Sequence, residues 1–281
     1  MKTSLIRPMP ALTAAALVLA ASDVAFATFV TRSVGGDSTA ASIQAIVDVF
    51  RADIGATNNG SAAGPLLGGR REINWDDGGA AITTSTTPFF AFQNIRGATF
   101  TTPGTGFVQA PASGLATQFG QAGYATNFTA FSAQRLFTPI GSNITEVTFS
   151  VPGSNGVIPA SVGGFGAVFS DVDEATSSRL QFFNLAGGEI FSQTVPAGSV
   201  NAGSFSFLGA SGNAGEQIFR VRITSGSVPV GVADGLNSDV VTVDDFIFRE
   251  PVPIPEPTTV LFGLGLLGAC LGGRPRRARL A

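Results

Sequence analysis

Between residues 28 and 250, apolar and polar positions alternate in short runs, and turns rich in Gly, Pro, Asn and Ser separate these runs. The clearest run is 217–224, in which Phe219, Val221 and Ile223 alternate with polar neighbours. One apolar face packed on a core and one polar face exposed to solvent are typical of an antiparallel sheet. The pattern predicts strands at 89–93, 98–101, 106–110, 127–131, 135–137, 144–151, 165–171, 179–185, 189–194, 204–208, 217–224 and 240–248.

Only one segment shows helical periodicity. Its apolar residues recur at i, i+3, i+4, i+7 and i+11, namely Ile43, Ile46, Val47, Phe50 and Ile54. Gly55 follows this stripe, and Asp37 with Ser38 precedes it as a candidate N-cap. The spacing predicts a helix at about 39–54, which we expect to pack on a sheet or to cover a sheet edge.

Many short strands, 36 glycines and a single helix favour a mainly β fold, an antiparallel β-sandwich of the jelly-roll type. The 24 phenylalanines would fill the space between the two sheets. A parallel β-helix is the alternative, although such a fold requires a fixed repeat period and the sequence shows none.

Both ends of the chain depart from this pattern. Lys2 and Arg7 precede an apolar stretch at 11–21, and the small residues Ala25 and Ala27 flank Phe26, which predicts a signal peptide over 1–27. At the other end, 258–273 carries no charged residue. It is shorter than the roughly 20 residues that span a bilayer, so it is marginal as a permanent anchor. We therefore expect one β-sandwich domain over 28–250 and a separate tail over 251–281.

The tail has three parts in a fixed order. Pro255, Glu256 and Pro257 come first, the apolar run follows, and a basic cluster ends it with Arg274, Arg276, Arg277 and Arg279. This arrangement closely resembles the PEP-CTERM sorting signal. The resemblance implies export by a Gram-negative bacterium, transient anchoring in the membrane, removal of the tail by an exosortase, and delivery to the cell surface or extracellular matrix beside exopolysaccharide. An ordinary short C-terminal anchor and a helix of the domain are the alternatives.

The charge of the domain restricts its partners. Residues 28–250 contain ten arginines, no lysine and seventeen acidic residues, so ten positive and seventeen negative side chains leave a net charge near −7. Such a surface repels nucleic acid and offers no polybasic site to anionic lipids. It is compatible with divalent cations and with neutral or cationic glycans.

The absence of histidine, and of cysteine outside the tail residue Cys270, narrows the chemistry. Nucleophilic triads and soft-metal sites lack their usual residues, so the metals that remain are oxygen-seeking ones, above all calcium. We expect no catalysis, and a structural or adhesion role instead. The alternative is a glycan hydrolase that uses two carboxylates. Its candidates are Asp76, Asp77, Asp171, Asp173, Asp244 and Asp245.

Two acidic elements are candidates for calcium. Asp171, Asp173 and Glu174 end one predicted strand, and Asp244 and Asp245 lie on the last one. Carboxylates that converge at a sandwich rim can supply the oxygens that calcium takes. In these elements the chain is similar to calcium-stabilised jelly-roll modules of secreted bacterial proteins. Alternatively, these are solvated turn residues or caps, with Asp244 or Asp245 paired to Arg220 or Arg222.

The only tryptophan, Trp75, stands in a short predicted strand that ends in an Asp-Gly turn. With Asn74 and Asp76 beside it, the ring is a candidate sugar contact. The alternative is a tryptophan packed beneath the turn.

Overall fold

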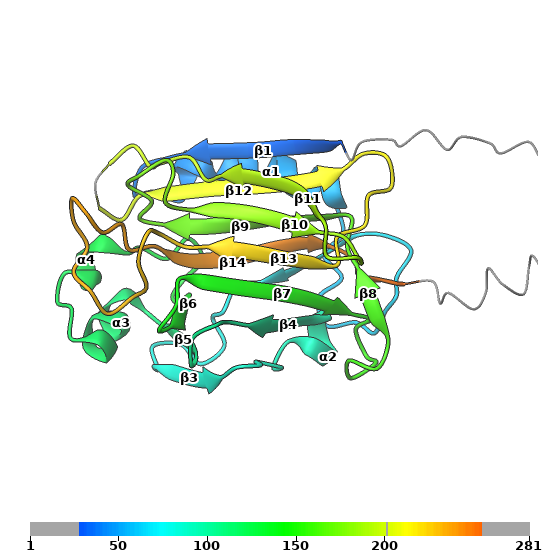
Figure 1. Cartoon of the computed structure of the whole chain (residues 1–281), viewed down its shortest axis with the longest axis horizontal. Coiled ribbons are helices and arrows are strands. Elements are labelled where there is room, and N and C mark those ends of the chain that lie inside the picture. Colours follow the sequence, from blue (N-terminus) through cyan, green and yellow to red (C-terminus); the bar gives the residue numbers. More distant parts are fainter. Residues whose placement is uncertain (1–27, 201, 255–281) are drawn as a thin grey trace, which may run out of the picture.

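The computed structural model describes residues 28–200 and 202–254, and these form a sandwich of two antiparallel sheets (Figure 1). Sheet A contains, in spatial order, β1 (Phe29–Gly35), β12 (Phe205–Gly212), β9 (Gly164–Ser170), β14 (Thr242–Arg249), β6 (Leu136–Ile140), β5 (Gly106–Ala110) and β3 (Thr83–Thr86), with β2 (Arg70–Ile73) paired to β14. Sheet B contains β11 (Glu189–Thr194), β10 (Arg179–Phe183), β13 (Arg220–Thr224), β7 (Ile144–Ser150), β8 (Pro159–Ser161) and β15 (Val252–Pro253), with β4 (Ala98–Thr101) paired to β7. The prediction of a mainly β, two-sheet antiparallel fold is confirmed.

The main core lies between the sheets and is rich in phenylalanine. Phe165 and Phe246 from sheet A meet Phe100 and Phe182 from sheet B in one buried cluster. Each such side chain contributes about 1.5–3 kcal/mol when it leaves water. Along β13, Val221 and Ile223 face this core while the intervening arginines face outward, as the alternation predicts.

Helix α1 (Ala41–Ile54) covers the outer face of sheet A and agrees closely with the prediction. Its stripe packs Phe50 on Phe207, whose rings lie 5.4 Å apart. Asp37 accepts a hydrogen bond from Thr39 N at 2.7 Å. The carboxylate therefore caps the turn before α1, and the N-cap residue Ala40 has no side-chain bond.

Three further helices correct the expectation of a single one. They are α2 (Gln93–Arg96), α3 (Ala112–Phe119) and α4 (Tyr124–Asn127). Pro111 precedes α3 and Gly120, at φ 66°, ends it, so α3 has a clear start and stop but is too short to show a helical period. Tyr124 and Phe128 bury their rings in a separate small cluster with residues of α3 and β5.

Two predicted strands are wrong for the same reason. Residues 127–131 begin in α4 and continue as a loop, and 89–93 form a single bridge, Phe89 to Phe100, before α2. Apolar residues that pack beside a short helix resemble strand residues when only their spacing is read. The strands β1, β3, β8 and β15 were not predicted from the sequence. β3 and β1 end sheet A, and β15 ends sheet B beside β8.

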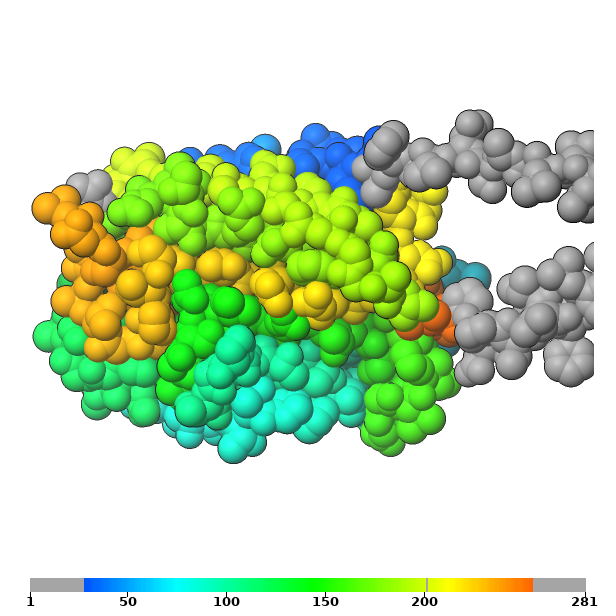
Figure 2. Space-filling view, viewed as in Figure 1, coloured from blue at the N-terminus to red at the C-terminus, as the bar shows by residue number. Residues whose placement is uncertain are grey.

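The strands β9 and β14 define the two ends of the molecule. Ser170 pairs with Thr242 at one end and Phe165 with Phe248 at the other. The described chain begins and stops at this second end, where Thr28 bonds Asn213 and Ile254 N donates to Pro159 O at 3.2 Å. In Figure 2 the orange loop before β14 and the green residues around β8 lie at opposite ends.

The segments assigned to export lie outside the described residues. These are the signal peptide with Ala25 and Ala27, the motif at 255–257, and the arginines between 274 and 279. Among residues 28–200 and 202–254, no helix combines the length and hydropathy needed to cross a bilayer.

Candidate functional site

Carboxylates from two loops meet at the end of the sandwich that is opposite the termini. Oxygens of Asp173, Asp234 and Asp239 lie within 4.8 Å of one another. Asp173 follows β9, whereas Asp234 and Asp239 precede β14. Because β9 and β14 pair through Ser170 and Thr242, the loops that leave them at this end are neighbours. We call this group, with Asp171 and Glu174, the acidic rim.

Hydrogen bonds hold two of the rim carboxylates in place. Asp239 accepts from the backbone N–H groups of Asp173 at 3.4 Å and Glu174 at 3.1 Å, and from the Ser177 hydroxyl. Asp234 accepts from Val240 N at 2.9 Å and from Asn127 Nδ2 at 3.1 Å. The carboxylate of Asp173, by contrast, accepts no hydrogen bond from the described residues.

Asp171 is the buried member of the rim. It is fully buried, and its φ of 73° lies in the left-handed region, which Asp tolerates better than most residues. Its Oδ1 accepts from Gly203 N at 3.0 Å. Its Oδ2 is buried and has no hydrogen-bond partner in the part of the chain that the structure describes. A buried carboxylate oxygen without a donor is costly, so it calls for a proton or a cation.

The electrostatics of the rim also favour a bound proton or cation. Burial, followed by the charges of Asp173 and Asp234, raises the pKa of Asp171 to about 8. Burial, followed by Asp234 and Asp239, raises the pKa of Asp173 to about 6. Burial likewise raises the pKa of Asp234. Within 28–200 and 202–254 no arginine forms an ion pair with any of these residues.

The rim surrounds a hollow that is large enough for an ion and its remaining ligands. The hollow has a volume of about 400 Å³ and is lined by Asp173, Glu174, Asp234, Gly235, Leu236 and Asp239. Calcium takes 6–8 oxygens at roughly 2.3–2.6 Å from carboxylates, carbonyls and water. An all-oxygen set without nitrogen or sulfur donors favours calcium or magnesium over zinc or copper.

The other acidic element, Asp244 and Asp245, does not join the rim. The β9–β14 register shifts between Val243 and Phe246, so two residues of β14 face one residue of β9. At this bulge Ser132 Oγ donates to Asp244 at 3.2 Å and to Asp245 at 2.7 Å. These two aspartates are therefore removed from the expected calcium site.

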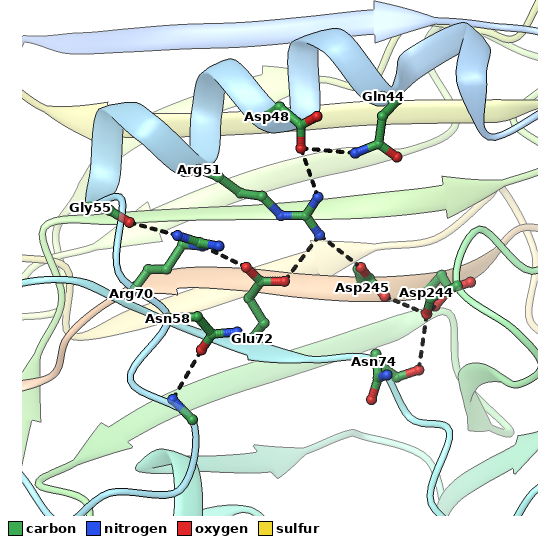
Figure 3. Close-up of polar contacts among 12 residues, drawn as sticks. Gln44, Asp48, Arg51, Gly55, Asn58, Arg70, Glu72, Asn74, Asp244 and Asp245 are labelled. Atoms are coloured by element: carbon green, nitrogen blue, oxygen red, sulfur yellow. Dashed lines mark hydrogen bonds and ion pairs between the residues drawn. The ribbon is translucent and has the colours of Figure 1, made fainter.

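Instead, Asp245 belongs to a polar network between α1 and sheet A (Figure 3). Arg51 Nη2 contacts Asp245 at 3.3 Å and Glu72 at 3.0 Å, and Arg70 Nε contacts Glu72 at 2.5 Å. Burial, with the neighbouring Asp245 charge, raises the pKa of Asp244 well above its usual range. Burial also raises the pKa of Asp245, while Ser132 and Arg51 oppose this rise.

The expected pairing of Asp244 or Asp245 with the arginines of β13 is also wrong. Arg220 and Arg222 contact Glu146 on the neighbouring strand β7, at 2.6 Å and 2.5 Å. They lie on the outer face of sheet B, where Arg220 also sits 3.8 Å above the Phe183 ring.

Trp75 is a core residue, which corrects its assignment as a sugar contact. It is 1% exposed, stacks on Phe137 with ring centroids 3.8 Å apart, and donates from Nε1 to Asp244 O at 2.8 Å. A ring enclosed in this way has no free face for a sugar. Asn74 is exposed, but the Trp75 ring next to it in the sequence is buried. Asp76 accepts a hydrogen bond from Arg135 N at 3.0 Å.

The expected site thus retains Asp171, Asp173 and Glu174 and gains two residues that sequence reasoning missed, Asp234 and Asp239. A signal for these two was present. Asp234 is followed by Gly235, Leu236, Asn237, Ser238 and Asp239, a glycine turn with oxygen-bearing side chains directly before the last strand.

No family model matches this chain, and no curated protein matches it. The solved structures that are weakly similar to this chain include the following two. One is the enzymatically active domain of bacteriophage CBA120 tailspike protein 4, at 12% identity and a TM-score of 0.20, with 71% of this chain covered. The chain spans only 22% of that protein. The other is the family 11 carbohydrate-binding module of cellulosomal cellulase Lic26A-Cel5E of Clostridium thermocellum, at 10% identity and a TM-score of 0.21, covering 71% of this chain and 95% of the module.

Proposed function

We propose that the protein is an exported, non-catalytic module with a jelly-roll-like β-sandwich, which binds calcium at the acidic rim and acts at the cell surface or in the extracellular matrix beside polysaccharide. One observation carries the calcium site. The carboxylates of Asp173, Asp234 and Asp239 converge within 4.8 Å, and no arginine of the described chain pairs with them. A divalent cation would offset the repulsion that, after burial, raises the pKa values of Asp173 and Asp234.

Calcium at this position would join two loops that are distant in the sequence. The loop after β9 supplies Asp173 and Glu174, and the loop before β14 supplies Asp234 and Asp239. A ligand that binds only the folded chain stabilises it by about 2.7 kcal/mol at a concentration 100 times its Kd. Exported domains are often stabilised by disulfides, but residues 28–254 contain no cysteine. The ion would therefore supply the cross-link between loops that a disulfide supplies elsewhere.

The export part of the proposal rests on the sequence at the two ends. The motif Pro255-Glu256-Pro257, the uncharged run 258–273 and the arginines after it support sorting by an exosortase-type enzyme with a transient membrane stage. Polysaccharide is the partner we propose, because coordination positions that the rim leaves open can take sugar hydroxyls.

Carboxylate-dependent glycan hydrolysis is the second candidate, and one observation favours it. Asp171 and Asp173 are near each other in the sequence and carry pKa values raised to about 8 and about 6, as expected of an acid held protonated beside a second carboxyl. The two proposals separate on one point: hydrolysis needs a proton on one acid, whereas calcium needs the rim ionised.

Calorimetric titration of calcium chloride into the chelator-treated full chain tests the proposal. We expect saturable binding and a rise in Tm, both lost in Asp173→Asn, whose carboxylate makes no hydrogen bond within the described residues. Asp77→Asn, which removes one exposed charge elsewhere, is the matched control and should bind like the parent chain. Equal binding by Asp173→Asn and Asp77→Asn would refute the rim as the site. Release of sugar from a glycan in the presence of chelator would favour the second candidate.

A further inference from the structure

The end of the sandwich from which the chain leaves at Ile254 is here called the exit end. It is built from three neighbouring segments, 56–69, 151–163 and 251–254, which are called loops below although the second includes β8 and the third includes β15. Backbone bonds join them: Gly64 N donates to Pro152 O at 2.8 Å, Glu250 N to Gly69 O at 3.0 Å, and Ile254 N to Pro159 O at 3.2 Å. The three loops therefore lie side by side at the end of the sandwich where the described chain stops (Figure 1).

Large apolar side chains gather on the exit end without cover. Leu67 is fully exposed and Val157 is 79% exposed, and Leu66, Ile158 and Val252 are exposed as well. Single exposed apolar residues are ordinary, but a group of them on adjacent loops marks an interaction surface.

Charge separates the two ends of the molecule. The three loops of the exit end contain no charged residue, whereas the loop after β9 and the loop before β14 carry the five carboxylates of the acidic rim. Charged residues outside these loops border the exit end: Glu216, Arg249 and Glu250 lie beside Val252. The guanidinium groups of Arg70, Arg71 and Arg96 bond to Ala56 O, Ala62 O and Ser61 Oγ. An apolar end whose own loops carry no charge, opposite an acidic end, suits contact with a lipid surface, because ionised carboxylates are excluded from it.

The sequence after Ile254 indicates which partner this surface would meet. Ile254 and Thr258, the first residue of the uncharged run, are four residues apart, so at most roughly 14 Å of extended chain separates them. If the run 258–273 enters a bilayer, the exit end is held within that distance of the lipid.

We propose that the exit end rests on the bilayer, with Leu66, Leu67, Val157, Ile158 and Val252 in the interfacial layer, while the acidic rim points away from the membrane. The proposal rests on the membrane stage of the proposed function. It adds a second contact to the tail and fixes the orientation in which the domain is presented before the tail is removed.

The full chain in vesicles of phosphatidylethanolamine and phosphatidylglycerol provides the test. A polarity-sensitive fluorophore is attached at Val157→Cys, and at Asn237→Cys on the opposite end as the control, each in a Cys270→Ser background. A third sample carries the fluorophore on native Cys270, which reports on the tail. We expect a blue shift and loss of intensity to a lipid-borne quencher at positions 157 and 270, and neither at 237.

The outcomes distinguish failure of the bilayer contact at the exit end from failure of the membrane stage in the proposed function. Quenching at 270 without quenching at 157 means that the tail inserts while the exit end stays in water, and the proposal is overturned. Quenching at neither position overturns the membrane stage as well. A blue shift at 157 in detergent that grows with protein concentration means that a second copy of the chain covers the exit end, which also overturns the proposal.

A second measurement tests whether the side chains themselves make the contact. Leu67→Ser with Val157→Ser should abolish the membrane-dependent protection of amides in 56–69 from hydrogen exchange, because these side chains are exposed and their loss leaves the core intact. Leu236→Ser, an equally exposed change at the acidic rim, is the control and should leave that protection unchanged. Protection that survives the double substitution contradicts the proposal.

Discussion

Asp173 and Asp239, 66 residues apart in the chain, are joined by a bond from the Asp173 backbone N–H to Asp239 Oδ1 at 3.4 Å. This bond is long, and it sits where two negative side chains face each other across two loops. The loops are thus placed by the pairing of β9 with β14 and by the hydrogen bonds that Asp239 accepts from Asp173 N, Glu174 N and Ser177, while the carboxylates of the two loops repel each other. A cation would convert that repulsion into the strongest link between them.

Calcium affinity should depend on pH in a defined direction. The pKa values of Asp171 and Asp173 are raised to about 8 and about 6, so protons compete with the ion over this range. The affinity should rise as the pH rises from 5 to about 8, with release of protons on binding. Calorimetry in buffers of different ionisation enthalpy measures that release. An affinity that is constant over this range would show that neither residue is a ligand.

Without calcium, the same shifts predict the opposite trend for stability. The folded chain holds these two protons more tightly than the unfolded chain, whose aspartates titrate near 3.9. Their contribution to the free energy of unfolding is therefore greatest at low pH and is lost as the pH rises through about 6 and about 8. Urea titrations at several pH values with chelator, compared with Asp171→Asn, isolate the part due to Asp171.

Replacement of Trp75 should be among the most damaging changes to the core. Trp75→Ala removes a ring in contact with Phe92, Phe100, Phe137 and Phe246, together with the bond to Asp244 O. The free energy of unfolding should fall by about 3–5 kcal/mol. Phe90→Ala, at a ring 53% exposed, should change it by less than about 0.5 kcal/mol. Urea unfolding followed by circular dichroism compares the two, and equal losses would place Trp75 outside the core.

The buried ion pair of Arg71 and Glu250 should be sensitive to removal of one partner. Two bonds of 2.7 Å join these side chains, which are 0% and 2% exposed. Glu250→Ala should cost about 3–5 kcal/mol, because it leaves an arginine buried without its counterion. Arg71→Met with Glu250→Leu should cost less than the single change. Arg32→Ala, from a pair at the surface, should cost at most about 1 kcal/mol. A double variant less stable than Glu250→Ala would contradict this account.

Sequence periodicity predicted those elements whose two faces differ in polarity. β13 and α1 each bury one face and expose the other, so their apolar spacing reported their structure. Where an element is short or packs on both sides, the spacing of its apolar residues does not distinguish a helix from a strand, as for α4 and the loop after it. Strand order was beyond the sequence, because neighbours such as β12 and β9 are chosen by packing between distant segments.

Two glycines beneath α1 show packing that the spacing of apolar residues does not reveal. An added Cβ at Gly166 would lie 2.7 Å from the Phe50 ring, and one at Gly209 2.8 Å from it. Gly209→Ala should therefore destabilise the fold by about 1–3 kcal/mol. Gly68→Ala, at a position with no atom within 4 Å of the added Cβ, is the control. Thermal unfolding of both variants measures the difference, and equal Tm values would mean that α1 shifts without cost.

The candidate site was predicted in part. Asp171, Asp173 and Glu174 followed a clear strand, and that strand does run into the rim. Asp244 and Asp245 were misassigned because a bulge redirects both side chains toward Ser132 and Arg51, and a bulge leaves no mark in apolar spacing. For Trp75 the sequence left two interpretations open, a sugar contact and a packed ring, and the buried ring agrees with the second. An aromatic residue among polar ones cannot be assigned to either until the strands around it are placed.

The direction of β14 has a mechanical consequence. It runs from beside the acidic rim to the exit end and pairs with β9, β6 and β2 along the way. A pull between a partner held at the rim and a tether beyond Ile254 would be directed along this strand. Its ladder bonds would then share the force together instead of opening one after another, as in a sheet peeled from its edge.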